Sequence, residues 1–419
     1  MNKKLSVLTV AVGVVFSVCG AGGDRGIHYG DRLTLHPYVS FSYTYDSNID
    51  SGKHGKNSSQ WNVNPGLNLD YKADNWGLDA AFFYTYHAYE RYSHELNTGS
   101  YGQSLEYRYS NVNNGRGWSI SLSEKFHQMS QDDDMTRDNG RGIGRDRKQW
   151  SFDGMIQRQI NDHLHAGVNG GYYFLEYDNN VDEYAPLYGW KRASFNGQLG
   201  WAISRKTDLI VCGGYSHYWQ DNDKDRYADF RGTEEARGRD IGSNSKGYTA
   251  SVGAQSRNQD GKLSYRATVG WSRFEYADNV HQSDGLVYNV SANWRISNTL
   301  NMMLLGSSYY QPSEREYGSA IKAYTVSWGL GKSLIKGSLS GTFDLSYRKE
   351  IHEYTEYSGD DYDEDIYTAR LGLTYRLCRY MDAFCSFEYQ GEETEGGASS
   401  SHEYDYDRWR ATVGFRLTY

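Results

Sequence analysis

The feature that most constrains this chain is an alternation of apolar and polar residues over segments of about ten residues. Successive side chains of a β-strand point to opposite faces, so each such segment has one apolar and one polar side. About ten residues suffice for a tilted strand to cross a bilayer, whereas strands of soluble sandwiches are usually shorter. In the last segment the apolar series is Trp409, Ala411, Val413, Phe415, Leu417 and Tyr419, and the polar series is Arg410, Thr412, Gly414, Arg416 and Thr418.

The same alternation recurs along the chain, at residues 33–45, 60–71, 324–330 and 342–348. The polar face of the segment at 60–71 carries no large apolar side chain, so it needs water. Lipid offers no hydrogen-bond partner to a strand edge, and only a sheet closed on itself satisfies both requirements. The sequence therefore predicts an all-β fold: a single transmembrane antiparallel β-barrel of the bacterial outer-membrane type. We count about 18 strands, and an indistinct hairpin around residues 96–116 leaves 16 open.

The connections between these segments alternate in length. Tight turns are expected at residues 74–75, 161–162, 205–206, 260–261 and 297–298, with long polar loops between them. In outer-membrane barrels the short turns face the periplasm and the long loops face outward, which places both ends of the barrel on the periplasmic side. Tryptophan and tyrosine residues near both ends of the segments are typical of the two aromatic girdles.

The N-terminus reads as a targeting segment. Residues 5–19 are apolar, two lysines precede them, and small residues follow, which predicts a secretory signal peptide over residues 1–22. Lipidation at Cys19 is a disfavoured alternative, because the branched Val18 precedes it. Residues 23–32 form a short periplasmic segment and residues 33–419 the barrel. So short a segment holds no plug domain, which argues against a ligand-gated transporter.

Charge and cysteine content exclude other classes. The formal charge is −9, and removal of residues 1–22, which carry two lysines and no acid, makes it −11. An acidic balance argues against a nucleic-acid partner. Three cysteines remain, Cys212, Cys378 and Cys385, and we expect them to be unbridged.

Several residues fit the pattern poorly. Pro37 and Pro65 lie on the apolar faces, where we expect them near strand starts or bulges. Glu124 and Arg158 also fall on apolar faces, and we interpret them as marks of a local register slip. The acidic runs at 132–134 and 360–365 match no calcium-loop spacing and predict solvated loops. The loop at 221–246 is long enough to fold inward.

The polar faces of the last strands carry the candidate site. Four arginines and two acids face the lumen there, and we hypothesise that they form a transverse charge array that sets ion or sugar selectivity. Cross-strand ion pairing on a wet wall is the simpler interpretation and the favoured one. The residues are Arg370, Arg376, Arg410, Arg416, Asp382 and Glu388. Lumen aromatics could stack on sugar rings, but their spread favours scattered packing; they are Tyr38, Phe83, Tyr89 and Tyr173.

Two short motifs resemble known patterns. The opening of the barrel, with its proline in the first strand and a Tyr-Asp-x-Asn-Ile ending, resembles a porin-like outer-membrane β-barrel family often associated with exopolysaccharide loci. The matching residues are Pro37, Tyr45, Asp46, Asn48, Pro65 and Gly66. The C-terminal Phe415, Leu417 and Tyr419 resemble the signal read by the barrel-assembly machinery.

These patterns predict a porin-like channel for solutes or for export of polysaccharide. The alternatives are a structural or adhesive barrel whose long loops bind external partners and, remotely, an outer-membrane hydrolase. No catalytic residue, cofactor or metal site is predicted. The expected partners are outer-membrane lipid and lipopolysaccharide and the barrel-assembly machinery. The resemblance to the porin-like family implies one further partner, a periplasmic polysaccharide-export protein.

Overall fold

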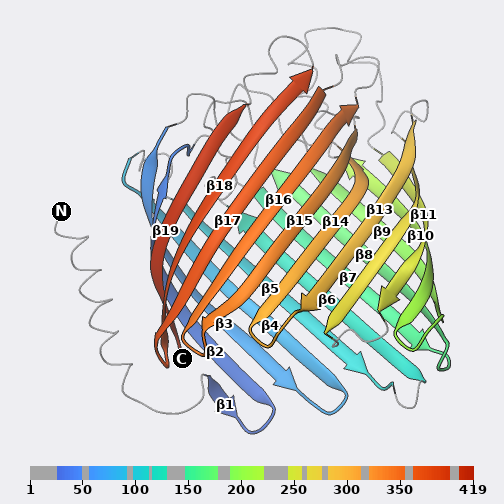
Figure 1. Ribbon diagram of the computed structural model, residues 1–419, viewed down its shortest axis with the longest axis horizontal. Coiled ribbons are helices and arrows are strands. Elements are labelled where there is room, and N and C mark those ends of the chain that lie inside the picture. Colours follow the sequence, from blue (N-terminus) through green and yellow to red (C-terminus); the bar gives the residue numbers. More distant parts are fainter. Residues whose placement is uncertain are drawn as a thin grey trace.

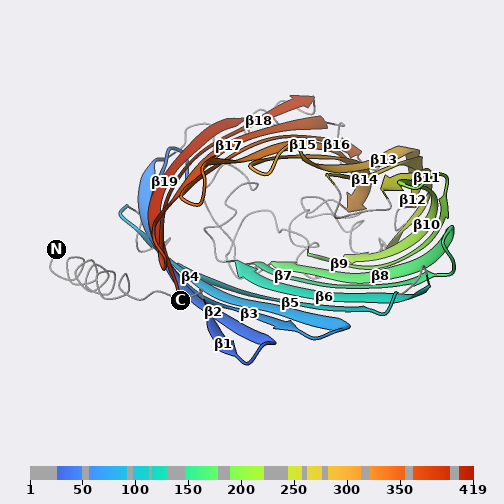
Figure 2. The ribbon, with the colours of Figure 1, turned by 60° about the horizontal axis from the view of Figure 1, so that its bottom comes forward.

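The computed structural model describes residues 26–49, 56–91, 98–112, 116–129, 147–177, 189–220, 244–256, 262–275, 282–312, 320–353, 362–396 and 405–419. Nineteen strands lie in these ranges, and eighteen of them, β2 to β19, form a closed antiparallel ring (Figures 1 and 2). The ring closes where β19 pairs with β2, with Phe415 opposite Phe41. The predicted barrel of about 18 strands is confirmed. Within the same ranges, no helix is long and apolar enough to span a bilayer.

The strands are β1 Ile27–Tyr29, β2 Leu33–Asp46, β3 Ser58–Lys72, β4 Trp76–Tyr89, β5 Thr98–Ser110, β6 Gly117–Met129, β7 Arg147–Gln159, β8 Leu164–Tyr177, β9 Trp190–Ala202, β10 Thr207–Gln220, β11 Asn244–Ser256, β12 Leu263–Glu275, β13 Gln282–Arg295, β14 Leu300–Pro312, β15 Ala320–Ile335, β16 Leu339–Glu353, β17 Tyr362–Cys378, β18 Met381–Gly396 and β19 Tyr406–Thr418. The hairpin that left 16 strands open is present as β5 and β6. The predicted turns at 74–75, 161–162, 205–206 and 297–298 join consecutive strands, and 260–261 lies outside the described residues. The predicted signal peptide also lies outside them.

The alternating residues of each strand point in turn to the lumen and to the outer face of the barrel. On β19 the apolar series faces outward, where Val413 and Phe415 are exposed, and Thr412 on the other face exchanges a hydrogen bond with Thr44 across the closure. Aromatic rings pair at both ends of the outer face. Trp61 and Trp409 contact Tyr43 and Tyr45 near the loop ends of the strands, and Trp76 contacts Tyr71 near the turns. The two aromatic girdles predicted from the sequence are therefore present, one at each end of an apolar band on the outer face.

The small strand β1 extends this wall. It pairs with β2 from Ile27 opposite Leu35 to Tyr29 opposite Leu33. The last described pair of β19 with β2 is Thr418 opposite Tyr38, so β1 continues the same edge of β2 just beyond the end of β19. Gly30, with a φ of +64°, makes the turn between β1 and β2. The segment at 23–32 thus contributes a strand.

Two interpretations from the sequence are wrong. No register slip occurs at Glu124 or Arg158, because the pairing of β6 with β5 and β7 is continuous. Glu124 lies on the outer face and accepts a hydrogen bond of 3.1 Å from the indole N–H of Trp150, while the Arg158 guanidinium lies 5.0 Å from the ring centre of Trp118. Aromatic neighbours at the wall therefore accommodate these charges without a shift in register.

The second error concerns the acidic run at 360–365. Asp363, Glu364 and Asp365 belong to β17, which is extended at its outer end, and only the first residues of the run precede the strand. The other acidic run and residues 221–243 of the predicted inward loop lie outside the described residues.

The prolines sit within strands. Pro37 is paired with Leu67, and its carbonyl accepts a hydrogen bond of 3.0 Å from the Tyr419 N–H. Pro65 is paired with Val39 on β2, but the register of β3 with β4 passes from Val63 to Gly66 and omits it. An interruption of the ladder is the usual way for a strand to hold a residue without an N–H.

One strand leaves the wall at its outer end. The pairing of β13 with β14 covers Asn289 to Arg295, whereas β14 stays paired with β15 as far as Pro312. Where the two strands part, the Tyr288 N–H donates a 3.0 Å hydrogen bond to Ser308 Oγ. Beyond this point the end of β14 turns into the ring (Figure 2). It packs there against lumen-facing residues of β10 and β12.

Candidate functional site

The predicted charge array lies on β17, β18 and β19, and the register arranges it in two rows. In the outer row Glu388 lies between Arg370 and Arg410 and forms an ion pair with each. Asp344 faces Arg370 on β16 and Asp46 faces Arg410 on β2, so acids and bases alternate across five strands. Because Arg408 forms a further ion pair with Asp46, the outer row is balanced by cross-strand pairs, as the simpler interpretation requires.

The inner row, nearer the periplasmic turns, is not balanced. Asp382 lies between Arg376 and Arg416, and Arg376 Nε is 3.7 Å from Asp382 Oδ1. The Asp382 side chain is 16% exposed, whereas that of Arg376 is 55% exposed. One covered carboxylate with two arginines leaves the inner row with an excess of positive charge toward the lumen. Rings of arginine or lysine favour anions in other pores.

A tyrosine and a glycine position the inner row. The Arg416 guanidinium lies 5.4 Å from the ring centre of Tyr38, within the range of a cation–π contact. The Tyr38 ring lies across Gly66 of β3, where a Cβ atom would come within 2.3 Å of Tyr38 Cζ. Gly66 belongs to the motif that resembles the porin-like family. Its missing side chain gives Tyr38 the space to lie along the wall beside Arg416.

The rest of that motif joins the first strand to the last. Arg408 Nε donates to both carboxylate oxygens of Asp46 at 3.0 Å, and both side chains are 6% exposed. The Asn48 side chain donates to the Asp407 carbonyl at 3.1 Å, and the Asn48 N–H donates to Asp46 Oδ1 at 3.0 Å. Tyr45 contacts Trp409 with ring centres 4.9 Å apart. We call Asp46, Asn48, Asp407 and Arg408 the closure cluster.

The C-terminal residues of the predicted assembly signal lie on the outer face. Phe415 and Tyr419 are exposed there, while Leu417 is buried. The Tyr419 ring stacks on Tyr380 with centres 5.6 Å apart. Their recognition by assembly machinery stays a prediction.

The lumen aromatics predicted from the sequence are spread over separate contacts. Tyr38 lies beside Arg416, Phe83 meets His127 edge to face at 5.3 Å, and Tyr89 is buried with Ile49. Tyr173 packs on Trp190 with ring centres 4.6 Å apart. Of these four, only Tyr173 joins a larger cluster.

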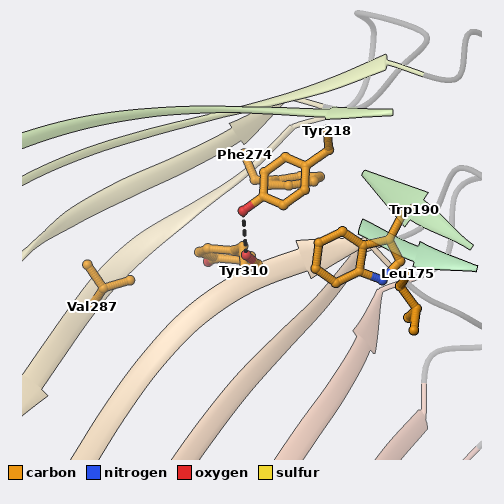
Figure 3. Packing of buried hydrophobic residues seen from close by; sticks show 6 residues of the cluster. All are labelled: Leu175, Trp190, Tyr218, Phe274, Val287 and Tyr310. Atoms are coloured by element: carbon orange, nitrogen blue, oxygen red, sulfur yellow. Dashed lines mark hydrogen bonds between the residues drawn. The ribbon is translucent and has the colours of Figure 1, made fainter. Parts of the chain in front are cut away.

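That cluster lies beneath the inward end of β14 (Figure 3). Tyr218 contacts both Trp190 and Phe274, and Phe274 stacks with Tyr310 of β14. The Tyr218 hydroxyl donates to the Tyr310 carbonyl at 3.5 Å. We call the buried residues Leu175, Trp190, Tyr218, Phe274, Val287 and Tyr310 the mouth cluster. Its side chains come from six strands, β8, β9, β10, β12, β13 and β14.

Residues 221–419 match the family described as "Putative beta-barrel porin 2". The chain resembles a β-barrel porin family. The predicted resemblance is confirmed, although the motif that suggested it lies in the other half of the chain. A closed barrel with an apolar outer face and this similarity indicate an outer-membrane barrel with a channel-like architecture.

Solved structures are more distantly similar to this porin-like chain. The outer membrane protein OpdK from Pseudomonas aeruginosa is 13% identical with a TM-score of 0.42, covering 92% of this chain and 99% of its own. The FrpB iron transporter from Neisseria meningitidis is 9% identical with a TM-score of 0.42, covering 92% and 81%. The copper transporter OprC is 10% identical with a TM-score of 0.43, covering 94% and 81%. No curated protein matched the chain.

Proposed function

We propose that the protein is a porin-like channel that passes anionic solutes, and that the inner row of Arg376, Asp382 and Arg416 sets this preference. The observation that supports the proposal is the excess of exposed guanidinium over covered carboxylate on the wall near the periplasmic turns. A fixed positive charge raises the local concentration of anions at a pore entrance. The outer row is balanced and contributes little to the preference.

The solute we favour is a polysaccharide carrying carboxylate groups and moving outward. Two features support an outward path: the family resemblance, and the location of the inner row at the end where a periplasmic polymer would enter. Outer-membrane lipid, the assembly machinery and a periplasmic export protein are the partners that this role would need. We propose no catalytic role.

The test is single-channel conductance of the refolded protein, without residues 1–22, in planar bilayers. Reversal potentials in a KCl gradient should show chloride preferred over potassium. Replacing both arginines, R376Q with R416Q, should move the reversal potential toward cations. A matched control, R205Q with K206Q in the turn between β9 and β10, removes the same charge away from these rows and should leave the potential unchanged.

Polymers then test the finer proposal. Polygalacturonate on the periplasmic side should block the current at lower concentration than neutral dextran of equal length, and the double arginine variant should lose this difference. Equal reversal potentials in the wild type and the double variant would remove the selectivity role. A folded, heat-modifiable barrel that conducts nothing would overturn the channel and favour the adhesive alternative.

A further inference from the structure

Three metal-ligating side chains meet at the outer end of β16 and β17, away from the charge rows. Glu350 and His352 lie on β16 and Glu364 on β17, all on the lumen face. They lie three to five residues beyond the pair Tyr347 and Tyr367 of the outer aromatic girdle. The exposed fraction of each is between 1% and 3%. The group is as buried as Asp46, Arg408 and Glu392, the other buried charges near the loop ends of the strands.

The distances within the group suit a metal ion. His352 Nε2 lies 3.5 Å from Glu350 Oε2 and 3.4 Å from Glu364 Oε2, and the three ligand atoms all lie within 4.8 Å of one another. Bonds of about 2.1 Å in a tetrahedral site place ligand atoms about 3.4 Å apart. The two nitrogen–oxygen separations therefore match two edges of such a site before any side chain moves.

The surroundings hold the imidazole in place. Its ring stacks on Tyr362 with centres 4.1 Å apart and an angle of 11°. Among the residues that the structure describes, neither ring nitrogen has a hydrogen-bond partner, although the side chain is almost fully buried. A buried polar atom without a hydrogen bond is costly, and Nε2 is directed at the two carboxylates. The ring is thus oriented as a ligand.

The charges also call for a cation. Glu350 and Glu364 are directly opposite in the register, and like charges in that position destabilise a sheet. Arg348 Nη2 lies 2.5 Å from Glu350 Oε1, the oxygen that does not face His352. Arg348 therefore leaves Oε2 of Glu350 on the side of the imidazole.

We propose that Glu350, His352 and Glu364 bind one Zn²⁺ ion at the mouth of the barrel. One imidazole nitrogen and two carboxylate oxygens are a common donor set for zinc, and a tetrahedral ion keeps a fourth position for water or a solute carboxylate. The nitrogen donor disfavours Ca²⁺ and Mg²⁺, which prefer oxygen alone. The bound ion would tie β16 to β17 beyond the girdle.

The first experiment is calorimetric titration of ZnCl2 into the refolded, chelator-treated full barrel in detergent. Saturable binding of one equivalent is expected, with CaCl2 and MgCl2 giving none. His352→Ala should abolish it, and Glu364→Gln should weaken it by more than about 10-fold, as loss of groups around a metal already does. His127→Ala, which removes a lumen histidine on β6, is the matched control and should bind like the wild type.

A second measurement needs no variant, and so guards against variants that fail to fold. Co²⁺ added to the wild-type barrel should give the intense visible absorption of a four-coordinate ion, and Zn²⁺ should displace it. The proposal is overturned if the wild type shows no saturable binding and no such spectrum, or if folded His352→Ala binds as the wild type does. Arg348 and a protonated His352 would then balance the two carboxylates.

Discussion

Two sectors of the ring differ in how their strands end. From β15 through β19 to β2 the ladders run nearly the full length of the strands, and the lumen face carries rows of paired charges. Between β13 and β14 the ladder stops early, and the end of β14, still paired with β15, contributes Tyr310 to the mouth cluster. One sheet therefore supplies two kinds of wall. Where strand pairing is continuous, charged side chains stay in register across the wall. Where pairing with one neighbour stops early, as at β14, the strand end turns into the ring.

The largest effect we expect comes from breaking the closure cluster. Asp46→Ala removes both carboxylate hydrogen bonds of a buried arginine, and loss of one member of a buried pair costs about 4 kcal/mol of unfolding free energy. Guanidinium unfolding of the barrel in vesicles measures this. Lys72→Gln breaks an exposed pair with Asp70 and should cost less than about 0.5 kcal/mol. Equal losses of unfolding free energy in the two variants would show that the closure cluster stabilises the barrel no more than an exposed ion pair does.

A smaller and more local effect is expected at the mouth. Phe274→Ala removes a fully buried ring between Tyr218 and Tyr310, and such truncations cost about 3 kcal/mol. We expect most of that loss to appear as faster amide exchange at residues 308–311, with a lesser change in global unfolding. Hydrogen exchange measured by mass spectrometry distinguishes this local opening from global unfolding. Uniformly faster exchange around the ring would contradict the division into two sectors.

The smallest effect concerns the support of the inner row. Gly66→Ala places a methyl group against the Tyr38 ring, and such overpacking costs about 1–2 kcal/mol. The displaced ring should also loosen Arg416 and reduce the anion preference of the conductance. Gly197→Ala is the matched control, because a Cβ there meets nothing within 4 Å. A selectivity change in the control, or none in Gly66→Ala, would argue against this support.

The faces, four of the five turns and a count of about 18 strands could be predicted from the sequence, because a period of two is a local property. The inward end of β14 could not be predicted in this way. Tyr310 continues the alternation of Leu304 and Gly306, and no local residue marks where pairing with β13 ends. That departure depends on Phe274 and Tyr218, which lie far away in the chain.

The charged residues show the same limit. Asp363, Glu364 and Asp365 were assigned to a solvated loop, but β17 extends beyond the girdle and includes them. His352 carried no signal, since Glu350 lies two positions away and Glu364 joins the group only as the strand partner of Glu350. The motif at Tyr45 to Asn48 was recognised, but its role in closure depends on residues near the C-terminus. The division of the charge array into a balanced outer row and an unbalanced inner row could be seen only from the strand register.

The closure between β2 and β19 has a consequence for the order of folding. Asp46 and Arg408 are separated by 362 positions, so the contact that completes the ring joins its first strand to its last. Contacts of such separation form late, since the entropy of a long loop must be overcome first. Until the final strand arrives, β2 presents an open edge. A chain cut short before residue 406 would expose that edge to the bilayer or to other chains, and its removal would fall to periplasmic quality control.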